Sequence, residues 1–322
     1  MSLLEVDHLT VDYKTRRGIV RAVNDVSFSM KKGETLGLVG ESGSGKSTLG
    51  LSLVRLIPPP GVITSGHIRV EKKDIVNLRD REMRSLRGSK IAFVFQDPMT
   101  SLNPVKKIGE HFIEFLRTHT PHISKKEALE RAKNILDELR IPKERINDYP
   151  HQFSGGMRQR IMIGLAIALN PSLVIADEPT TALDVIVQDK ILDILRDLSR
   201  AHDMTLILIT HDLSIVLERC DNIFVMYAGH QVEYGDSEEI YRDPKHPYTQ
   251  KLLRSIPNIE LADQKLDAIP GSPPDLLNLP KGCPFWPRCS HAMAICRTKM
   301  PPIINLEDGH LVKCFLYGET ES

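Results

Sequence analysis

A phosphate-binding pattern lies near the start of the chain. Residues 40–47 read GESGSGKS, which matches G-x-x-x-x-G-K-[ST]. Glycine has no Cβ that would clash with phosphate oxygens, so such a loop can wrap an anion with its N–H groups pointing inward. We expect Lys46 to reach the β and γ phosphates of ATP and the Ser47 hydroxyl to bind Mg²⁺. The other residues of this segment expected to contact the nucleotide are Gly40, Ser42, Gly43, Gly45 and Thr48.

An acidic pair offers the second part of a hydrolytic site. Asp177 and Glu178 directly follow the apolar run at residues 173–176. Ligands collect at the carboxyl ends of strands in parallel sheets, which is where this pair would lie. We expect Asp177 to hold Mg²⁺ through water and Glu178 to orient or deprotonate the attacking water. The two patterns together predict ATP hydrolysis.

Both patterns need a strand before them, and the sequence supplies it. Residues 35–39 form a short apolar run before the phosphate loop, and residues 47–57 have helical periodicity after it. Similar short apolar runs alternate with helical segments further along the chain, at residues 91–95, 173–176, 205–209 and 223–226. This alternation predicts an α/β protein whose parallel sheet is covered on both faces.

Other segments have different periodicity. Residues 2–13 and 19–30 partly alternate between apolar and polar side chains and predict antiparallel strands. Residues 105–140 predict two helices separated by Pro121. After about residue 255 prolines become frequent and helical periodicity is lost, so we predict a domain boundary there.

Length and charge limit the function classes. The chain has 322 residues, enough for about two domains, and its 42 basic and 42 acidic side chains cancel. This balance of positive and negative charge gives no reason to expect general binding to nucleic acid or to a membrane surface. No apolar run is long enough to span a membrane, and the first residues do not resemble a secretory signal. We therefore expect a cytosolic protein.

Four of the five cysteines are concentrated near the end of the chain. Their spacing is C-x5-C-x6-C-x17-C, formed by Cys283, Cys289, Cys296 and Cys314. Four thiolates can bind a tetrahedral zinc ion or a [4Fe–4S] cluster. Zinc sites of this kind usually contain C-x2-C pairs, which are missing here, so the spacing favours the cluster and leaves zinc as the alternative. The fifth, Cys220, is expected to be a plain buried thiol.

A third glycine-containing pattern resembles the signature of ATP-binding-cassette (ABC) ATPases. Residues 153–160 read FSGGMRQR, with Phe153 and Met157 departing from the usual form. The resemblance implies that Ser154, Gly155 and Gly156 contact the ATP of a facing subunit. It also implies an ABC-type nucleotide-binding domain over residues 1–255, with a parallel core sheet, an antiparallel β subdomain and a helical subdomain at about 97–160. Residues 256–322 would form a small irregular domain that carries the cysteines.

Further single residues match the same family. Gln96 resembles the glutamine that contacts Mg²⁺ and the attacking water, and His211 resembles the histidine that contacts the γ-phosphate. Residues 182–184 resemble the loop that communicates across the dimer, which places Asp184 near the nucleotide. Tyr13 resembles the aromatic residue that stacks on adenine, although it is also an ordinary strand residue. The resemblance therefore implies that Glu178, His211 and Gln96 carry the catalysis.

A narrower resemblance points to the ATPases of dipeptide and oligopeptide importers, which include nickel importers. It rests on residues 96–104 (QDPMTSLNP), residues 246–249 (HPYT), residues 269–274 (IPGSPP) and the cysteine-bearing tail. The subfamily implies two transmembrane permease subunits, a second homologous ATP-binding subunit and an extracellular peptide-binding protein. It places the chain on the cytoplasmic face of the cell membrane and also favours the iron–sulfur cluster.

Two alternatives remain open from the sequence. A nickel importer would use the same ATPase motifs. A soluble ABC ATPase that acts on nucleic acid or ribosomes belongs to a different class, but such proteins usually have two cassettes or long coiled coils. This chain has one cassette, no heptad run and no basic excess, so we expect no nucleic-acid partner.

Overall fold

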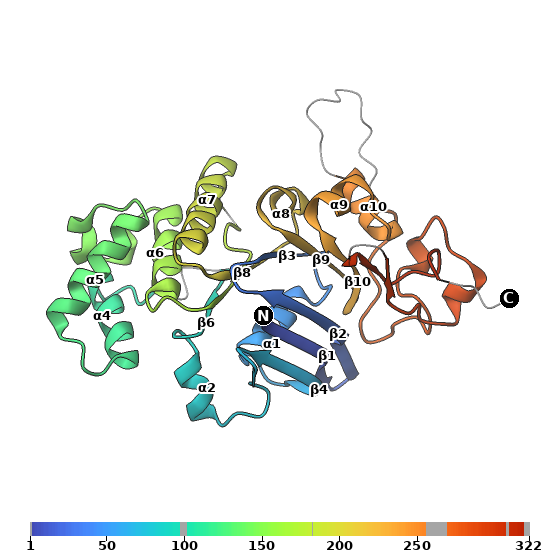
Figure 1. Ribbon diagram of the computed structural model, residues 1–322, viewed down its shortest axis with the longest axis horizontal. Coiled ribbons are helices and arrows are strands. Elements are labelled where there is room, and N and C mark those ends of the chain that lie inside the picture. The colour runs from blue at the N-terminus through green and yellow to red at the C-terminus, as the bar shows by residue number, and fades with distance from the viewer. Residues whose placement is uncertain (1, 97–101, 182, 256–268, 307–308, 319–322) are drawn as a thin grey trace. The chain divides into compact units, whose positions relative to one another are not determined.

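The computed structural model describes the whole chain except residues 1, 97–101, 182, 256–268, 307–308 and 319–322 (Figure 1). The chain forms two compact units. Unit 1 contains residues 31–34 and 77–207, and unit 2 contains residues 2–30, 35–76 and 208–322.

An antiparallel sheet forms the first part of unit 2. Its strands follow the order β2 (Gly18–Lys31), β1 (Ser2–Thr15), β4 (Gly61–Val70) and β5 (Lys73–Asp74). In the pair of β1 and β4, Leu4 lies opposite Val70 and Tyr13 lies opposite Gly61. The apolar side chains of β1 are buried, but burial does not strictly alternate, because residues 9–12 are all buried. The antiparallel strands expected near the N-terminus are therefore confirmed.

A second sheet of unit 2 carries the phosphate loop. The strands of this sheet that lie in unit 2 follow the order β11 (Ile304–Asn305), β12 (Leu311–Val312), β10 (His230–Asp236), β9 (Asn222–Tyr227) and β3 (Thr35–Val39). β3 and β9 are parallel, whereas β10 pairs antiparallel with both β9 and β12. The C-terminal segment was expected to be irregular, but it adds two short strands to this sheet. Strands of two residues have no detectable periodicity, which is why the sequence did not predict them.

Helices of unit 2 flank these strands: α1 (Lys46–Leu53), α8 (Leu213–Arg219), α9 (Ser237–Arg242) and α10 (Pro247–Arg254). α1 ends at Leu53, so the predicted end at residue 57 is wrong. Arg55 has a left-handed backbone with φ of 49°, and prolines follow at 58–60, so the helix cannot continue. α8 packs closely on β3, because a Cβ on Gly37 would lie only 2.4 Å from Cβ of Val216.

Unit 1 contains a parallel strand pair and most of the long helices. β6 (Ile91–Val94) and β7 (Leu173–Asp177) are parallel, with Val94 opposite Ala176, and β8 (Thr205–Thr210) neighbours β7. Only residues 205–207 of β8 belong to unit 1, and its remaining residues belong to unit 2. The helices are α2 (Asp80–Leu86), α4 (Ile108–His119), α5 (Lys125–Glu138), α6 (Gly155–Ile167) and α7 (Val185–Ala201). α4, α5 and α6 pack together (Figure 1), and α4 and α5 are separated at Pro121 as predicted.

The helical group has a compact apolar core. Phe112 of α4 and Leu136 of α5 are fully buried. A Cβ on Gly164 of α6 would lie 2.5 Å from the Leu139 side chain, so the glycine lets α6 approach the end of α5. Two 3₁₀ turns, at Lys143–Asn147 and Pro150–Gln152, connect α5 to α6. These turns deliver the Ser-Gly-Gly sequence to the start of α6.

The predicted domain boundary at residue 255 falls next to residues 256–268, which lie outside the described residues, and it stays a prediction. The C-terminal segment contains two further 3₁₀ turns, at Trp286–Arg288 and Ala294–Arg297. Among the helices of the described chain, none has the length and apolar character needed to cross a membrane.

Candidate functional site: a nucleotide site and a cysteine cavity

The phosphate loop connects β3 to α1 in unit 2. Gly40, Gly43 and Gly45 have φ of 149°, 78° and 103°, a region that side chains rarely adopt. A Cβ on Gly40 would lie 2.1 Å from the Met226 carbonyl oxygen, and one on Gly45 would lie 2.1 Å from that of Ala22. Two of the glycines are therefore required by the packing of the loop against its own unit, in addition to the room they leave for phosphate.

Lys46 lies at the start of α1 and is buried. Its Nζ donates to the carbonyl oxygens of Gly40 at 2.7 Å and Glu41 at 2.9 Å. The ammonium group is therefore held inside the loop, where a phosphate would meet it. Ser47 is exposed on the first turn of α1, as Ser42 is on the loop. The structure places the predicted phosphate-binding residues of this loop together.

Tyr13 lies beside the same helix. Its hydroxyl oxygen is 3.3 Å from Oγ1 of Thr48, so the end of β1 is connected to the first turn of α1. The side chain is half-buried and comes from the strand end that the sequence indicated. The structure thus brings Tyr13 next to the phosphate loop, in agreement with a position beside the nucleotide.

The acidic pair lies at the end of β7 in unit 1. Asp177 is buried as the last residue of the strand, and Glu178 has a left-handed backbone with φ of 43°. Gln96 Nε2 donates to Glu178 Oε2 at 3.0 Å, and Thr181 Oγ1 donates to the same oxygen at 2.9 Å. Two predicted site residues are therefore in contact. Thr181 was not predicted, because a threonine hydroxyl after Glu-Pro-Thr has no distinctive spacing.

The signature residues lie at the start of α6. Ser154 is the N-cap, and its Oγ accepts a hydrogen bond from Met157 N–H at 3.4 Å. A Cβ on Gly156 would lie 2.5 Å from Val187 Cγ1, so this glycine lets α6 approach α7. The first N–H groups of a helix have no partner within the helix, so the start of α6 is of the kind that binds anions.

Asp184 is the N-cap of α7 and accepts a hydrogen bond from Val187 N–H at 2.9 Å. Both Asp184 and Ser154 are exposed, as are Val185 and Ile186 in the first turn of α7. Of the predicted dimer loop, Ala182 lies outside the described residues, as do residues 97–101 of the segment that follows Gln96.

His211 lies directly after β8 and is exposed. It belongs to unit 2 together with the phosphate loop and Tyr13. Gln96, Ser154, Asp177, Glu178 and Asp184 belong to unit 1. The predicted nucleotide residues are thus distributed over both units, and within each unit they lie at the ends of strands or the starts of helices.

The four clustered cysteines line one small cavity in unit 2. Its other walls are mainly apolar side chains, among them Phe285, Trp286, Met293, Phe315 and Leu316. All four are free thiols. Burial raises the pKa of Cys283 to about 12 and that of Cys314 to about 11, and the neighbouring cysteines add to both increases. The topology therefore gathers all four predicted ligands around one cavity.

In the described part of the chain, no three His, Cys, Asp or Glu side chains are placed so that they could hold a metal ion. The predicted iron–sulfur cluster and the zinc alternative therefore both stay predictions. Cys220 is buried away from the other cysteines, and burial raises its pKa to about 12, as expected for a plain thiol.

Two residues that the sequence did not predict contact the phosphate loop. The Tyr248 hydroxyl accepts a hydrogen bond from Glu41 N–H, and the Arg288 guanidinium binds the Glu41 carboxylate. Tyr248 lies in the HPYT segment, which the sequence marked only as a subfamily resemblance. Arg288 lies between Trp286 and Cys289 in the cysteine-bearing segment, and nothing in its spacing indicated a contact with residue 41.

Comparison with protein families gives two matches. Residues 23–181 match the ABC transporter family, and residues 232–296 match the family described as oligopeptide/dipeptide transporter, C-terminal region. Among solved structures, the dimeric ATP-binding cassette MJ0796 in a post-hydrolysis state bound to ADP and Pi has a TM-score of 0.65 and 29% identity, covering 73% of this chain and 98% of that one. The structure of cbiO1 from Clostridium perfringens has a TM-score of 0.64 and 27% identity, covering 75% and 91%.

Curated relatives match over nearly the whole chain. The oligopeptide transport ATP-binding protein OppD of Bacillus subtilis is 50% identical over 318 residues, which cover 98% of this chain and 88% of OppD. OppD of Salmonella typhimurium is 48% identical, covering 97% and 93%. The dipeptide transport ATP-binding protein DppD of B. subtilis is 45% identical, covering 98% and 95%.

The phosphate loop after β3, the acidic pair after β7 and the Ser-Gly-Gly start of α6 are the features of an ABC-type P-loop ATPase, and the solved cassettes share this fold. The chain belongs to the oligopeptide and dipeptide transport ATP-binding proteins, a family of the ABC transporters. The family and fold class predicted from the sequence motifs are therefore confirmed.

Proposed function

We propose that this chain is the ATP-hydrolysing subunit of an importer that takes up dipeptides or oligopeptides across the bacterial cytoplasmic membrane. The names of relatives that are 45–50% identical over nearly the full length support the transport role. The observation that carries the hydrolytic role is the hydrogen bond from Gln96 to Glu178, because it orients a carboxylate at the end of a P-loop ATPase strand.

The residues divide the chemistry of hydrolysis between them. Lys46 and the loop N–H groups neutralise charge on the β and γ phosphates. Ser47, Asp177 and Gln96 would hold Mg²⁺, which supplies further neutralisation of the phosphates. Glu178 orients the attacking water, and the hydrogen bonds from Gln96 and Thr181 to Oε2 fix its carboxylate. His211 contacts the γ-phosphate, and Tyr13 stacks on adenine.

A second ATP-binding subunit would complete each site. Ser154 caps α6, whose first residues are Gly155 and Gly156, and Asp184 caps α7; Ser154 and Asp184 are exposed, whereas Gly156 is buried. These residues would contact the ATP bound by the partner, which gives two ATP molecules between two homologous subunits. The exposed apolar side chains of Val185 and Ile186, beside Asp184, support a surface that becomes buried by such a partner.

Transport requires subunits that span the membrane. The helical region at about residues 97–160 has Gln96 at its edge, so a permease helix docked there could influence the residue that contacts Glu178. We propose that this region docks a cytoplasmic helix of the permease, in an assembly with two permease subunits and an extracellular binding protein that delivers the peptide. The chain would then lie on the cytoplasmic face of the membrane, and ATP binding would shift the permease between its inward- and outward-facing states.

The four-cysteine cavity has the donor set and the apolar surroundings of a thiolate-bound group, but the thiols would have to move closer together to bind one, since the described residues place no three of them to hold a metal ion. All four cysteines line one cavity whose apolar and aromatic walls would limit access of water. We propose a [4Fe–4S] cluster held by Cys283, Cys289, Cys296 and Cys314, with Zn²⁺ as the alternative. When bound, either group would cross-link the C-terminal segment; the cluster could in addition respond to redox conditions.

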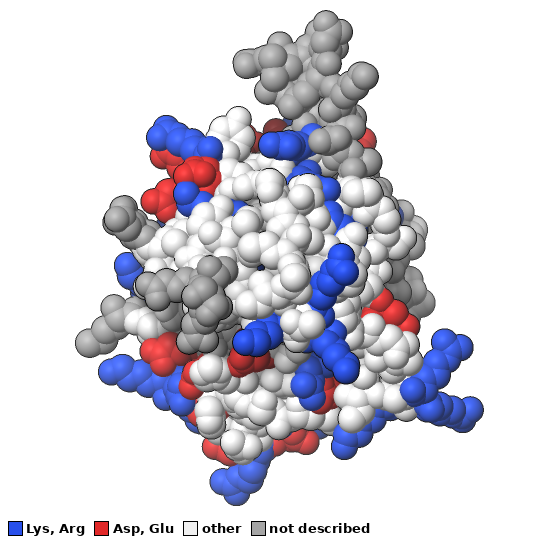
Figure 2. Space-filling view, turned by 90° about the vertical axis from the view of Figure 1, so that its right-hand side faces the viewer, with Lys and Arg blue, Asp and Glu red and all other residues white. Residues whose placement is uncertain are grey.

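Nickel import stays the alternative within the subfamily, because the nucleotide site does not contact the cargo. Action on nucleic acid is less well supported. On the face shown in Figure 2, Lys and Arg side chains are interspersed with Asp and Glu, and the whole chain has no net charge. Binding to a phosphate backbone instead requires a concentration of positive charge.

Reconstitution tests the proposed function. The chain would be co-expressed with its genomic neighbours, purified with the membrane proteins that accompany it, and incorporated into lipid vesicles. We expect a peptide-loaded binding protein to stimulate ATP hydrolysis and uptake of labelled peptide, and Ni²⁺ to have no effect. Uptake of Ni²⁺ would instead identify a nickel importer. ATP hydrolysis stimulated by RNA or DNA, without any membrane partner, would contradict transport.

A further inference from the structure

The C-terminal segment contacts the phosphate loop through one charged side chain. Arg288, whose side chain is only 5% exposed, places its two terminal nitrogens 2.7 and 3.0 Å from the two oxygens of Glu41. Paired hydrogen bonds of this kind fix the relative orientation of both groups. Arg288 also donates from Nε to the Pro270 carbonyl at 2.8 Å and from Nη1 to the Tyr227 hydroxyl at 3.2 Å. The guanidinium therefore has a single orientation.

A second contact holds the backbone of the same loop residue. Glu41 N–H donates to the Tyr248 hydroxyl at 2.8 Å, and the Tyr248 side chain is fully buried. Its ring packs against Tyr227 at 4.6 Å and Phe285 at 5.3 Å between centroids. Phe285 comes from the cysteine-bearing segment, so this segment supports both Arg288 and Tyr248.

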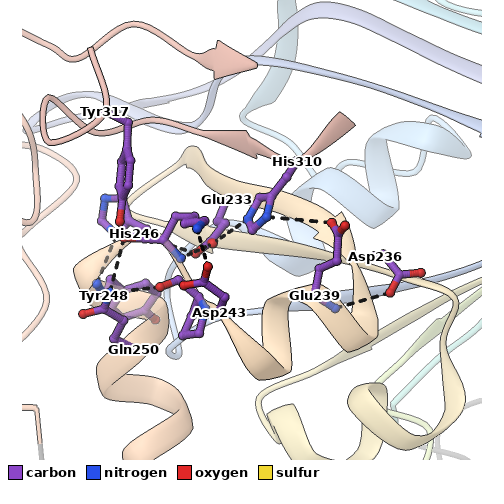
Figure 3. Close-up of polar contacts among 11 residues, drawn as sticks. Glu233, Asp236, Glu239, Asp243, His246, Tyr248, Gln250, His310 and Tyr317 are labelled. Atoms are coloured by element: carbon purple, nitrogen blue, oxygen red, sulfur yellow. Dashed lines mark hydrogen bonds and ion pairs between the residues drawn. The ribbon is translucent and has the colours of Figure 1, made fainter. Parts of the chain in front are cut away.

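The start of α10, which carries Tyr248, is fixed by a buried carboxylate (Figure 3). Glu233 accepts hydrogen bonds from Lys245 N–H at 2.6 Å and His246 N–H at 3.0 Å. His310 of the C-terminal segment donates from Nε2 to the same carboxylate at 2.7 Å. His246 in turn caps α10, because its Nδ1 accepts the Tyr248 N–H at 3.0 Å. The C-terminal segment thus positions Tyr248 as well as Arg288.

Glu41 matters for nucleotide binding because of its carbonyl group. The Lys46 ammonium donates to the Glu41 carbonyl oxygen at 2.9 Å, so the position of residue 41 helps to set the position of Nζ. A rotation of the Glu41 peptide would also turn the neighbouring loop N–H groups, which are the expected phosphate donors. Small displacements of such groups weaken binding strongly, because the donors must converge on the anion.

We propose that Arg288 is a positioning residue for the phosphate loop: by binding the Glu41 carboxylate, it holds Lys46 and the loop N–H groups in the arrangement that binds nucleotide phosphates. The proposal rests on the proposed nucleotide function and extends it, since it makes the cysteine-bearing segment part of the ATP site. Arg288 directly precedes Cys289, so a structural change at the cysteine cavity would displace Arg288 and with it the phosphate loop. By the same coupling, nucleotide binding at the loop would affect the cysteine cavity.

The nucleotide affinity of variants shows whether Arg288 positions the phosphate loop or only anchors the C-terminal segment. The dissociation constant of MgATP would be measured by equilibrium titration for the purified full chain and the variants Arg288→Met and Arg288→Lys. We expect Arg288→Met to raise this dissociation constant about tenfold, which corresponds to the loss of about one charge-assisted hydrogen bond. Arg288→Lys should recover part of the loss, because an ammonium group keeps the charge but not the paired geometry.

Arg297 provides the matched control. It is an exposed arginine of the same segment, stacked 5.0 Å from the Trp286 ring centroid. Arg297→Met should change the MgATP dissociation constant by no more than about twofold, as is usual for substitutions at the surface. If Arg288→Met lowers the melting temperature but leaves the dissociation constant unchanged, or if Arg297→Met weakens binding equally, positioning by Arg288 is wrong.

A double variant covers the case in which Arg288→Met does not fold, since it leaves Glu41 without its main partner. Glu41→Gln combined with Arg288→Met removes the charge and should fold, yet bind MgATP about tenfold more weakly than wild type. Wild-type affinity in this double variant overturns the proposal. Failure of the unaltered chain to bind MgATP would instead contradict the nucleotide function itself, so the two failures are distinguishable.

Discussion

Gln96 and Glu178 are joined by a 3.0 Å hydrogen bond although 82 residues separate them along the chain. The sheet explains this contact. β6 and β7 are parallel neighbours with Val94 opposite Ala176, so Gln96 and Glu178 each lie two residues beyond a matched pair at the carboxyl ends of the strands. Gln96 thereby holds the carboxylate that we propose orients the attacking water.

The Thr181 hydroxyl supports the same carboxylate and provides the first prediction. In Thr181→Val the side chain keeps its shape but loses the donor to Glu178 Oε2. We expect kcat of the assembled transporter to fall about fivefold, the effect of a hydrogen bond worth about 1 kcal/mol, with MgATP affinity unchanged. Thr181→Ser keeps the hydroxyl and should keep the rate. Equal rates for the valine variant and wild type would show that this contact does not orient Glu178.

The glycines of the phosphate loop differ in what surrounds them. Gly45→Ala would place a Cβ 2.1 Å from the Ala22 carbonyl oxygen at φ of 103°, whereas Gly43→Ala meets nothing within 4 Å at φ of 78°. We expect Gly43→Ala to lower the free energy of unfolding by about 1–2 kcal/mol, from backbone strain alone. Gly45→Ala should lower the free energy of unfolding by about 3 kcal/mol or more, because backbone strain and steric clash add. Urea unfolding measures both, and equal losses would contradict the packing described here.

The buried His230 makes stability depend on pH. Its Nε2 accepts a hydrogen bond from the Asn24 amide, and burial, aided by the charge of Lys313, lowers the pKa of His230 to about 3. The unfolded side chain takes up a proton near pH 6.5 and the folded one only near pH 3, so stability falls as the pH decreases between these values. From pH 7 to pH 5 we expect this histidine to cost about 2 kcal/mol.

Urea unfolding at both pH values tests this dependence. His230→Gln keeps a hydrogen-bond acceptor for Asn24. The loss of unfolding free energy between pH 7 and pH 5 should be about 2 kcal/mol smaller in this variant than in wild type. His122→Gln, a change at an exposed position, is the control and should leave the loss in place. An unchanged pH dependence in His230→Gln would mean that other groups cause the acid sensitivity.

The cysteine cavity predicts a bound group in anaerobically purified protein. We expect broad visible absorbance and about four iron and four sulfide per chain, as for a [4Fe–4S] cluster with four cysteine ligands. Cys289→Ser should remove most of the iron, whereas Cys220→Ser should not, because Cys220 does not line the cavity. Colourless protein with stoichiometric zinc would contradict the cluster and support the alternative.

Much of the site was predictable because its residues are set by local patterns. The phosphate loop, Asp177 and Glu178 follow apolar strands, and Ser154 and Asp184 cap helices, so their positions depend on short-range structure. Gln96 was recognisable only by family resemblance, and its contact with Glu178 depends on the pairing of β6 with β7.

Contacts between distant segments were not predictable. The bond between Glu41 and Arg288 joins residues 247 positions apart, and neither residue type is unusual in its own segment. β11 and β12 are too short to give a periodic signal, and α1 ends early because of the backbone at Arg55. Such features depend on tertiary packing, which local propensity does not contain.

Lys46 and Glu178 separate binding from hydrolysis. The Lys46 ammonium is held inside the phosphate loop, so Lys46→Ala should weaken MgATP binding itself. Lys126→Ala, a change at an exposed position of α5, is the control and should have no effect. In the proposed mechanism Glu178 acts on water rather than on the phosphates, so we expect its substitution to leave MgATP binding intact.

The most direct test of the account compares wild type and Glu178→Gln in the assembled transporter, measuring the MgATP dissociation constant and the rate of phosphate release on the same samples. We expect the MgATP affinity to stay within about threefold of wild type while the rate of phosphate release falls at least about 100-fold, roughly the contribution of general acid–base catalysis. Phosphate release near the wild-type rate in Glu178→Gln would contradict the assignment of Glu178 and with it the proposed hydrolytic site.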